Sequence, residues 1–220
     1  MIKKGIYPKT KRMSVLGDKV YITEKLDGSN LAIFKLEGVL YFAQRGIIIT
    51  YNDLETDKQA LYKGLYQWIK DNIEYLQEHL IERSVICGEW LGMGQLKYDV
   101  GEFDKRFYMF AKANIDENFE LCNIIYDHNL FIYPFENENI PGFIGVVPKV
   151  MELSVIPNKE YLDGIYEKYT LKVKRNVEGF VVNYNNIIFK YVRMKNGKLS
   201  EYFDRGVRND LTNLTKQMSK

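Results

Sequence analysis

The stretch Glu24-Lys25-Leu26-Asp27-Gly28-Ser29-Asn30 joins two predicted strands, from Val20 to Leu26 and from Leu31 to Leu36. It places a lysine at the end of the first strand, and the glycine that follows permits a tight turn and a close backbone approach. A lysine between two acidic residues is usually half of a surface ion pair. Only residues elsewhere in the chain can therefore give Lys25 a chemical role.

The segments after this stretch predict an antiparallel meander followed by a long helix. Two further strands, Val39 to Ala43 and Ile47 to Thr50, are joined through Arg45-Gly46. From Asp53 to Arg83, apolar residues recur at steps of three and four, which is typical of one amphipathic helix with its apolar stripe in the core. The stripe consists of Leu61, Leu65, Trp68, Ile69, Ile73, Leu76 and Leu80.

The rest of the chain predicts short strands and one more helix, from Lys159 to Tyr169. The strands are Ser84 to Trp90, Phe107 to Lys112, Glu178 to Asn183 and Ile187 to Val192. Asparagine tolerates left-handed backbone angles, so Asn183 to Asn186 predicts a tight turn between antiparallel neighbours. The predicted fold class is α+β, with antiparallel sheets flanked by helices.

The composition is that of an ordinary globular protein and does not exclude an enzyme. Of the 220 residues, 46% are hydrophobic and 27% are charged. No repeat or linker divides the sequence, so we expect one domain over residues 1–220. The formal net charge of +2 gives little overall indication of a nucleic-acid partner, but it allows a local basic groove.

The cysteines and the N-terminal residues bear on the cellular compartment. Cys87 and Cys122 lack the spacing of a zinc site and lie among apolar residues, so we expect free thiols in the core. Residues 1–12 lack an apolar signal segment, and no apolar run approaches bilayer length. We expect a cytoplasmic protein in a reducing environment, without a membrane partner.

Later segments supply the chemical context that Lys25 requires. Four short segments each contain one candidate residue: Glu89, Phe110, Glu178 or Lys190. In the same order, the segments are Cys87-Gly88-Glu89-Trp90-Leu91-Gly92, Phe107-Tyr108-Met109-Phe110, Val177-Glu178-Gly179-Phe180-Val181-Val182 and Phe189-Lys190-Tyr191-Val192-Arg193. Together with the lysine stretch, this ordered set resembles nucleotidyltransferase motifs I, III, IIIa, IV and V of covalent polynucleotide ligases and capping enzymes. Five short matches in order are far more specific than any one of them.

Within that superfamily, the chain is most similar to RNA ligases of the phage and trypanosome-editing type. Asn30 ends the first motif, where DNA ligases and capping enzymes usually carry arginine. Gly88-Glu89 with Gly92 and Gly94 follows the RNA-ligase pattern, and residues 195–201 resemble the tail after motif V. The resemblance implies an ATP-grasp-like adenylation domain that uses ATP and Mg²⁺ to join RNA 5′-phosphate and 3′-hydroxyl ends.

The resemblance also implies site residues, with Lys25 as the catalytic nucleophile that forms lysyl-AMP. Neighbouring positive charge, from Lys190 and Mg²⁺, should favour the neutral amine and offset charge in the transition state. Glu178 is the expected metal ligand, because Mg²⁺ prefers hard oxygen donors. The implied cofactor-binding residues are Glu24, Asn30, Arg45, Glu89, Phe110, Lys190, Arg193 and Lys195.

Three of these residues would contact the nucleoside side of ATP. Glu89 would accept a hydrogen bond from the ribose, and Arg45 would contact the sugar and a phosphate. Phe110 would stack on adenine, although an ordinary inward-facing strand residue would give the same pattern.

The phosphate-binding cations include one departure from the family pattern. Lys190 would hold the α-phosphate, but Val192 occupies the position where close relatives carry a second lysine. The second cation is therefore either Arg193 or Lys195, and a bidentate arginine is not equivalent to a lysine.

Three functions remain open: an RNA ligase, a small DNA ligase, and a nucleotide-binding relative that modifies protein or does not seal strands. Asn30 disfavours the second function, and retention of every expected catalytic residue type disfavours the third. After Glu201 there is room for about one helix, so we expect no OB-fold or separate C-terminal domain. RNA would then be bound by the groove around the site, by loops such as residues 91–106, or with an accessory protein.

Overall fold

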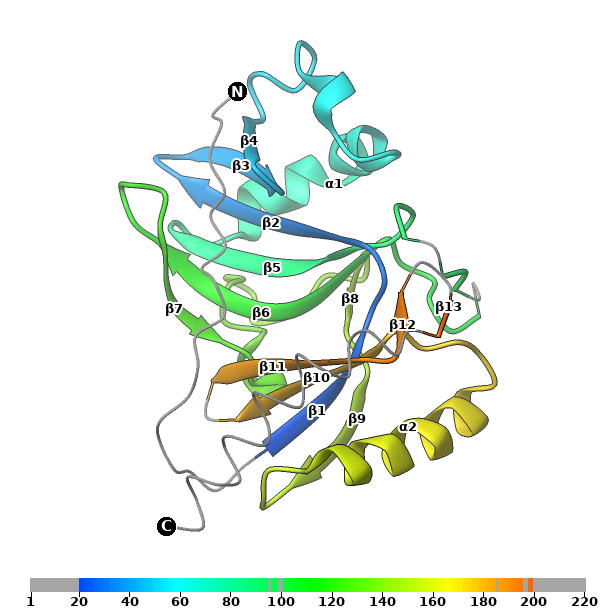
Figure 1. The fold of residues 1–220 in the computed structure, drawn as a ribbon. Helices are drawn as coiled ribbons and strands as arrows, with labels where there is room; N and C mark the ends of the chain where they lie inside the picture. The colour runs from blue at the N-terminus through cyan, green and yellow to red at the C-terminus, as the bar shows by residue number, and fades with distance from the viewer. Residues whose placement is uncertain (1–19, 95, 99–100, 185, 196–197, 200–220) are drawn as a thin grey trace. The chain divides into compact units, whose positions relative to one another are not determined.

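The computed structural model describes residues 20–94, 96–98, 101–184, 186–195 and 198–199 (Figure 1). This part of the chain falls into two compact units. The first contains Gly28–Gly94 and Tyr98–Val146, and the second contains the residues up to Asp27, residues 96–97 and the residues from Val147 onward. The single catalytic domain over residues 1–220 stays a prediction.

The first unit is built on a seven-stranded sheet in the order β4-β3-β2-β5-β6-β7, in which β8 pairs with β6. All neighbours are antiparallel except β8, which runs parallel to β6. The strands are β2 (Ser29–Leu36), β3 (Val39–Gln44), β4 (Ile47–Thr50), β5 (Ser84–Trp90), β6 (Phe107–Ile115), β7 (Leu121–Ile125) and β8 (Ile144–Val146). The predicted meander is confirmed, whereas β7 and β8 were not predicted.

One face of this sheet packs against helix α1 (Leu65–His79). The helix contributes Leu65, Ile69 and Leu76 to a cluster that includes Trp90 and Phe107 of the sheet. This confirms that the apolar stripe belongs to the core.

The predicted helix from Asp53 to Arg83 was too long at both ends. Gly64 adopts a left-handed backbone with φ of 82°, and Leu80 is already extended. Residues 53–64 form turns and the 3-10 helix Lys58–Ala60. The spacing of apolar residues therefore continued beyond the helix, because Leu61 and Leu80 pack into the core although they lie outside α1.

The opposite face of the sheet carries a second apolar cluster, in which alanines such as Ala32 and Ala111 lie beside larger residues such as Phe34. Cys87 lies in this cluster, and its burial raises the pKa of its thiol to about 12. Cys122 on β7 is exposed, so the prediction of a core thiol is confirmed for Cys87 and wrong for Cys122. A surface strand can carry an apolar neighbourhood in sequence without burying every residue.

The second unit is a four-stranded antiparallel sheet in the order β11-β10-β1-β9. Its strands are β1 (Val20–Lys25), β9 (Lys149–Leu153), β10 (Gly179–Tyr184) and β11 (Ile187–Val192), and β12 (Met194–Lys195) pairs with β13 (Lys198–Leu199). Helix α2 (Lys159–Val173) covers one face of the four-stranded sheet (Figure 1). The predicted hairpin between the last two long strands is confirmed, and Asn186 is left-handed with φ of 65°.

The predicted helix from Lys159 begins at the right residue but continues past Tyr169 to Val173, where Lys174 turns left-handed. The antiparallel sheets are confirmed. The described residues contain two α-helices and are mostly β, so flanking helices form a smaller part of the fold than predicted. Within these residues, no helix combines the length and apolar character needed to cross a membrane.

The close approach of β5 to β6 gives a stability prediction for Gly88→Ala. An added Cβ would lie 2.4 Å from the Phe107 ring and 2.5 Å from the Tyr108 carbonyl oxygen. We expect a loss of about 1–3 kcal/mol in the free energy of unfolding, measured by urea denaturation. Gly142→Ala is the control, because Gly142 is exposed and has no atom within 4 Å of the added carbon. Equal stability of the two variants would contradict the packing described here.

Candidate functional site

Lys25 ends β1 directly opposite Gly179 of β10. Its Nζ donates a hydrogen bond to Oε2 of Glu178 at 2.6 Å, and the two side chains are 20% and 15% exposed. The ion partner is therefore a residue 153 positions away rather than an acidic neighbour in sequence. The structure thus brings together the predicted nucleophile and the predicted metal ligand.

Glu178 lies in a mixed electrostatic environment. Burial raises the pKa of its carboxyl group, the charge and hydrogen bond of Lys25 lower it, Asp27 raises it and Lys190 lowers it. The net result is a raised pKa, because desolvation of the charged form is the largest effect. The predicted nucleophile Lys25 and the predicted phosphate-binding Lys190 therefore both act electrostatically on this carboxylate.

The backbone around Glu178 is held as closely as its side chain. Its carbonyl oxygen accepts hydrogen bonds from the N–H groups of Arg193 at 2.8 Å and Met194 at 3.0 Å. A Cβ on Gly179 would lie 2.0 Å from the Tyr191 carbonyl oxygen, so only glycine permits this approach of β10 to β11. The glycine after Glu178 is therefore required by strand packing.

A metal site at Glu178 would depend mainly on ligands from outside the protein. Among the described residues, no group of three or more histidine, cysteine or acidic side chains could hold a metal ion. Mg²⁺ is commonly bound by one or two carboxylates together with water and substrate phosphates. The single carboxylate of Glu178 fits that kind of site and does not fit a closed structural site.

Glu24 has its side chain on the face of the sheet that α2 covers. It is 1% exposed, and its carboxylate accepts two hydrogen bonds from Arg175 at 2.5 and 2.7 Å and one from Tyr169 at 2.8 Å. The structure thus gives Glu24 a buried structural role, and cofactor binding by this residue stays a prediction. The sequence did not reveal Arg175, which follows the end of α2 in a basic run typical of a helix terminus.

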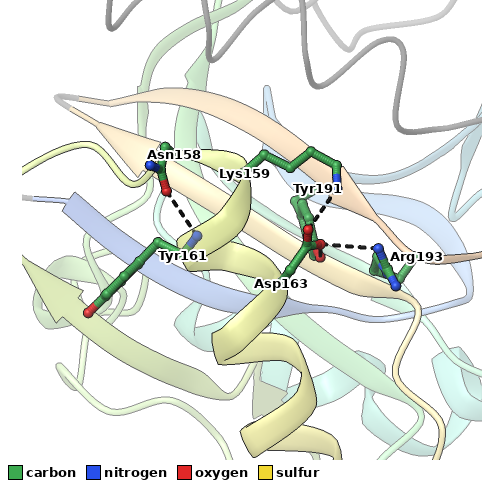
Figure 2. Close-up of polar contacts among 6 residues, drawn as sticks. All are labelled: Asn158, Lys159, Tyr161, Asp163, Tyr191 and Arg193. Atoms are coloured by element: carbon green, nitrogen blue, oxygen red, sulfur yellow. Dashed lines mark hydrogen bonds and ion pairs between the residues drawn. The ribbon is translucent and has the colours of Figure 1, made fainter.

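Arg193 is also directed to the α2 face, unlike Lys190. Its Nη1 donates to Asp163 at 3.1 Å (Figure 2). Its guanidinium lies 5.7 Å from the centre of the Tyr166 ring. Strand alternation places Lys190 on the other face. Arg193 therefore lies on the face away from Lys190, and the choice between Arg193 and Lys195 as the second cation stays a prediction. The side chain of Lys195 is outside the described part, as are residues 196–197 and 200–201 of the predicted tail.

In the first unit, Asn30 and Glu89 lie opposite one another on β2 and β5. Glu89 accepts hydrogen bonds at 3.1 Å from the Asn30 amide and from the Gly28 N–H. A Cβ on Gly28 would lie 2.4 Å from the Trp90 carbonyl oxygen, so glycine is needed for this approach. Asn30 and Glu89, both predicted to bind the nucleotide, are thus hydrogen-bonded to each other.

Arg45 is exposed in the turn between β3 and β4, and a tyrosine links it to Asn30. Its N–H donates to the Tyr62 hydroxyl at 3.2 Å, and that hydroxyl donates to the Asn30 carbonyl at 3.2 Å. The buried Gln44 accepts a hydrogen bond from the Tyr62 N–H at 2.6 Å. Sequence reasoning missed Tyr62, because it lay within the predicted long helix.

Phe110 is half-buried on β6, beside a register shift between Cys87 and Gly88 on the neighbouring strand. It packs against the apolar cluster on the face away from α1. This placement is compatible with core packing and with a ring edge open to a ligand. Adenine stacking by Phe110 stays a prediction.

The family of the chain follows from comparison with known sequences. The family model described as RNA ligase matches residues 18–192, which include Lys25, Glu89, Phe110, Glu178 and Lys190 but not Arg193 or the tail. The chain belongs to the RNA ligase family. Among curated proteins, no sequence matches this RNA ligase family member.

Solved RNA ligases share the fold of this family member. An archaeal ATP-dependent RNA ligase is 18% identical, with a TM-score of 0.50, and the alignment covers 84% of this chain and 48% of that protein. A mutant RNA ligase of Naegleria gruberi with ATP and Mn is 16% identical, with a TM-score of 0.51, over 91% of this chain and 58% of that protein. The chain spans about half the length of these ligases.

The buried pair of this RNA ligase family member gives a second stability prediction. Arg175→Met should lower the free energy of unfolding by about 3–5 kcal/mol, because it leaves the Glu24 carboxylate buried without its charge partner. The double variant Glu24→Gln/Arg175→Met should lose less, because no uncompensated charge remains. Chemical denaturation measures both. Arg83→Met is the control and should change stability little, because Arg83 pairs with Glu117 on the surface; a similar loss in the control would refute the role of burial.

Proposed function

We propose that the chain is an ATP-dependent RNA ligase that joins a 5′-phosphate to a 3′-hydroxyl through lysyl-AMP on Lys25. The observation that carries this proposal is the 2.6 Å contact between Lys25 and Glu178. It pairs a candidate nucleophile with a candidate metal ligand, both within the segment matched by the RNA ligase family. The shared fold of the archaeal and Naegleria gruberi ligases supports the same activity.

The first chemical step follows from the placement of Lys25. The unprotonated Nζ attacks the α-phosphorus of ATP, a nitrogen–phosphorus bond forms, and pyrophosphate leaves with the electrons of the broken phosphorus–oxygen bond. The bonded nitrogen then releases a proton to water, which gives the neutral phosphoramidate nitrogen. Before attack, Nζ must lose a proton, and the Glu178 carboxylate is a hydrogen-bonded acceptor at 2.6 Å. Lys190 adds positive charge in the same electrostatic environment, which would help to hold the α-phosphate.

Glu178 would also hold Mg²⁺, for which one carboxylate together with substrate phosphates is sufficient. When bound, this ion would offset the negative charge of the phosphates. Lys195 would supply the second phosphate-binding cation, because Arg193 is held by Asp163.

The first unit supplies the proposed contacts to the nucleoside. Glu89, whose carboxylate accepts hydrogen bonds from Gly28 and Asn30, would accept a hydrogen bond from a ribose hydroxyl. The exposed Arg45 would contact the sugar and a phosphate, and Phe110 would stack on adenine.

This proposal includes an ATP-grasp-like adenylation domain, with RNA ends as substrates and an accessory protein or domain for their binding. The free cysteines support a reducing, cytoplasmic location.

Covalent adenylation tests the nucleophile. Wild-type protein incubated with labelled ATP and Mg²⁺ should form a covalent protein–AMP adduct that is stable in alkali and cleaved in acid, as expected of a nitrogen–phosphorus bond. Lys25→Ala should abolish it because no amine remains to attack phosphorus. Lys149→Ala is the matched control, since Lys149 pairs with Glu152 on the surface of the same unit. A full yield of adduct in Lys25→Ala would remove Lys25 from this role, and loss of adduct in the control would show a general effect of lysine removal.

Polymer choice separates an RNA ligase from the alternative of a small DNA ligase. Sealing should require ribonucleotides on the 3′-hydroxyl side, because a 2′-hydroxyl offers hydrogen bonds that DNA lacks. The strand with the 5′-phosphate can be either polymer. A gel assay comparing the four strand combinations measures this asymmetry. Equal rates on all-DNA junctions and on junctions with RNA at the 3′-hydroxyl would favour the DNA-ligase alternative.

A further inference from the structure

We infer that Asp163 and Arg193 are positioning residues that hold the backbone of Glu178 in place from the opposite face of the sheet. We call Asp163, Arg193 and Tyr166 the α2 clasp; the guanidinium of Arg193 lies over the ring of Tyr166. The consequence of the clasp for adenylation rests on the proposed function. Its existence rests only on contacts within the second unit.

Asp163 joins helix α2 to the end of β11. One carboxylate oxygen accepts from the Tyr191 hydroxyl and from Arg193 Nη1, the latter at 3.1 Å, and the other accepts from Lys159 Nζ at 2.7 Å (Figure 2). Burial raises the pKa of Asp163, but the hydrogen bonds of Lys159 and Tyr191 and the charges of Lys159 and Arg193 outweigh it, so the pKa is lowered. The carboxylate is therefore held in its charged form by three donors, one from α2, one from β11 and one from the residue that follows β11.

Tyr166 holds the chain on the other side of Glu178. Its hydroxyl donates to the carbonyl oxygen of Val177 at 2.7 Å, and its ring lies beneath the Arg193 guanidinium. Tyr166 is 7% exposed and packs in the core between α2 and the sheet. Helix α2 thus contacts the residue before Glu178 directly and reaches the segment hydrogen-bonded to Glu178 through Arg193.

The clasp acts on Glu178 through the backbone. The N–H groups of Arg193 and Met194 both donate to the Glu178 carbonyl oxygen, and no side-chain atom fits between Gly179 and β11. A displacement of residue 193 would therefore displace Glu178, whose carboxylate contacts Lys25 at 2.6 Å. Misplacement of a reacting group by about 1 Å can slow a reaction on the order of a hundredfold.

A positioning role and a phosphate-binding role for Arg193 predict different behaviour of Asp163. If Arg193 positions Glu178, removing either member of the pair breaks the same connection. If Arg193 instead binds a phosphate of ATP, Asp163 only competes for its guanidinium, and its removal would leave ATP binding intact or improve it. The effects of the two single substitutions and of their combination decide between these roles.

The experiment measures single-turnover adenylation for Asp163→Ala, Arg193→Ala and the double variant. Each single variant should be slowed by about ten- to a hundredfold with little change in the KM for ATP, and the double variant should be no slower than the worse single variant. The Mg²⁺ concentration for half-maximal rate should rise, as it should in the reference variant Glu178→Ala. Glu152→Ala, which removes an acidic residue from a surface pair in the same unit, should match the wild type.

Amide hydrogen exchange gives a readout independent of catalysis. The N–H groups of Arg193 and Met194 should exchange at least about tenfold faster in Asp163→Ala, because their bonds to Glu178 open more often. Asp163→Asn retains an acceptor and should restore part of the protection. It replaces the alanine variant if that variant does not fold by its thermal melting curve.

Two results would overturn the inference. One is unchanged exchange and unchanged adenylation in Asp163→Ala or Asp163→Asn. The other is a raised KM for ATP in Arg193→Ala alone, which would make Arg193 a phosphate ligand. A wild-type protein that forms no adduct would instead refute the proposed function, and exchange at residues 193 and 194 would still decide whether the clasp exists.

Discussion

The antiparallel pairing of β1 with β10 is the constraint on which the arrangement of charges in the second unit depends. It sets Lys25 opposite Gly179 and so beside Glu178. Because successive side chains on a strand point to opposite faces, Glu24 must point toward α2 when Lys25 points away from it. The sheet thus separates charges with structural partners, such as Glu24, from the charges proposed to meet ATP. A shift of one residue in the register of β1 against β10 would move Glu24 to the face away from α2 and Lys25 to the face toward it.

The strands were largely predictable from sequence because their core-facing sides carry apolar residues at alternate positions. The limits of α1 were not predictable, since the apolar spacing continued on both sides of the helix. The left-handed Gly64 sets its N-terminal limit, and α1 begins only at Leu65. Strand β9 was missed because it is an edge strand with only half-buried and exposed side chains, so burial imposes little alternation on it. The spacing of apolar residues therefore predicted the elements that line the core, but not the ends of α1 or the edge strand β9.

The candidate site was predictable in its residue types but not in their partners. A lysine followed by a glycine turn, or a glutamate before a glycine, is visible as a local motif. Tyr62, Asp163 and Arg175 contact those motifs from distant segments, and no spacing in the sequence connects them. Arg193 shows the limit most clearly, because its nearness to Lys190 in sequence suggested a shared ligand, whereas alternation and Asp163 direct it to the other face.

The long separation between β1 and its neighbours has a consequence for synthesis of the chain. Val20–Lys25 is synthesised well before its partner strands, Lys149–Leu153 and Gly179–Tyr184, which lie more than a hundred residues further along the chain. Pairings between distant segments carry a large loop-closure cost and form slowly. Lys25 can thus meet Glu178 only after the intervening residues have been synthesised, so a nascent chain that ends before Glu178 lacks the assembled pair.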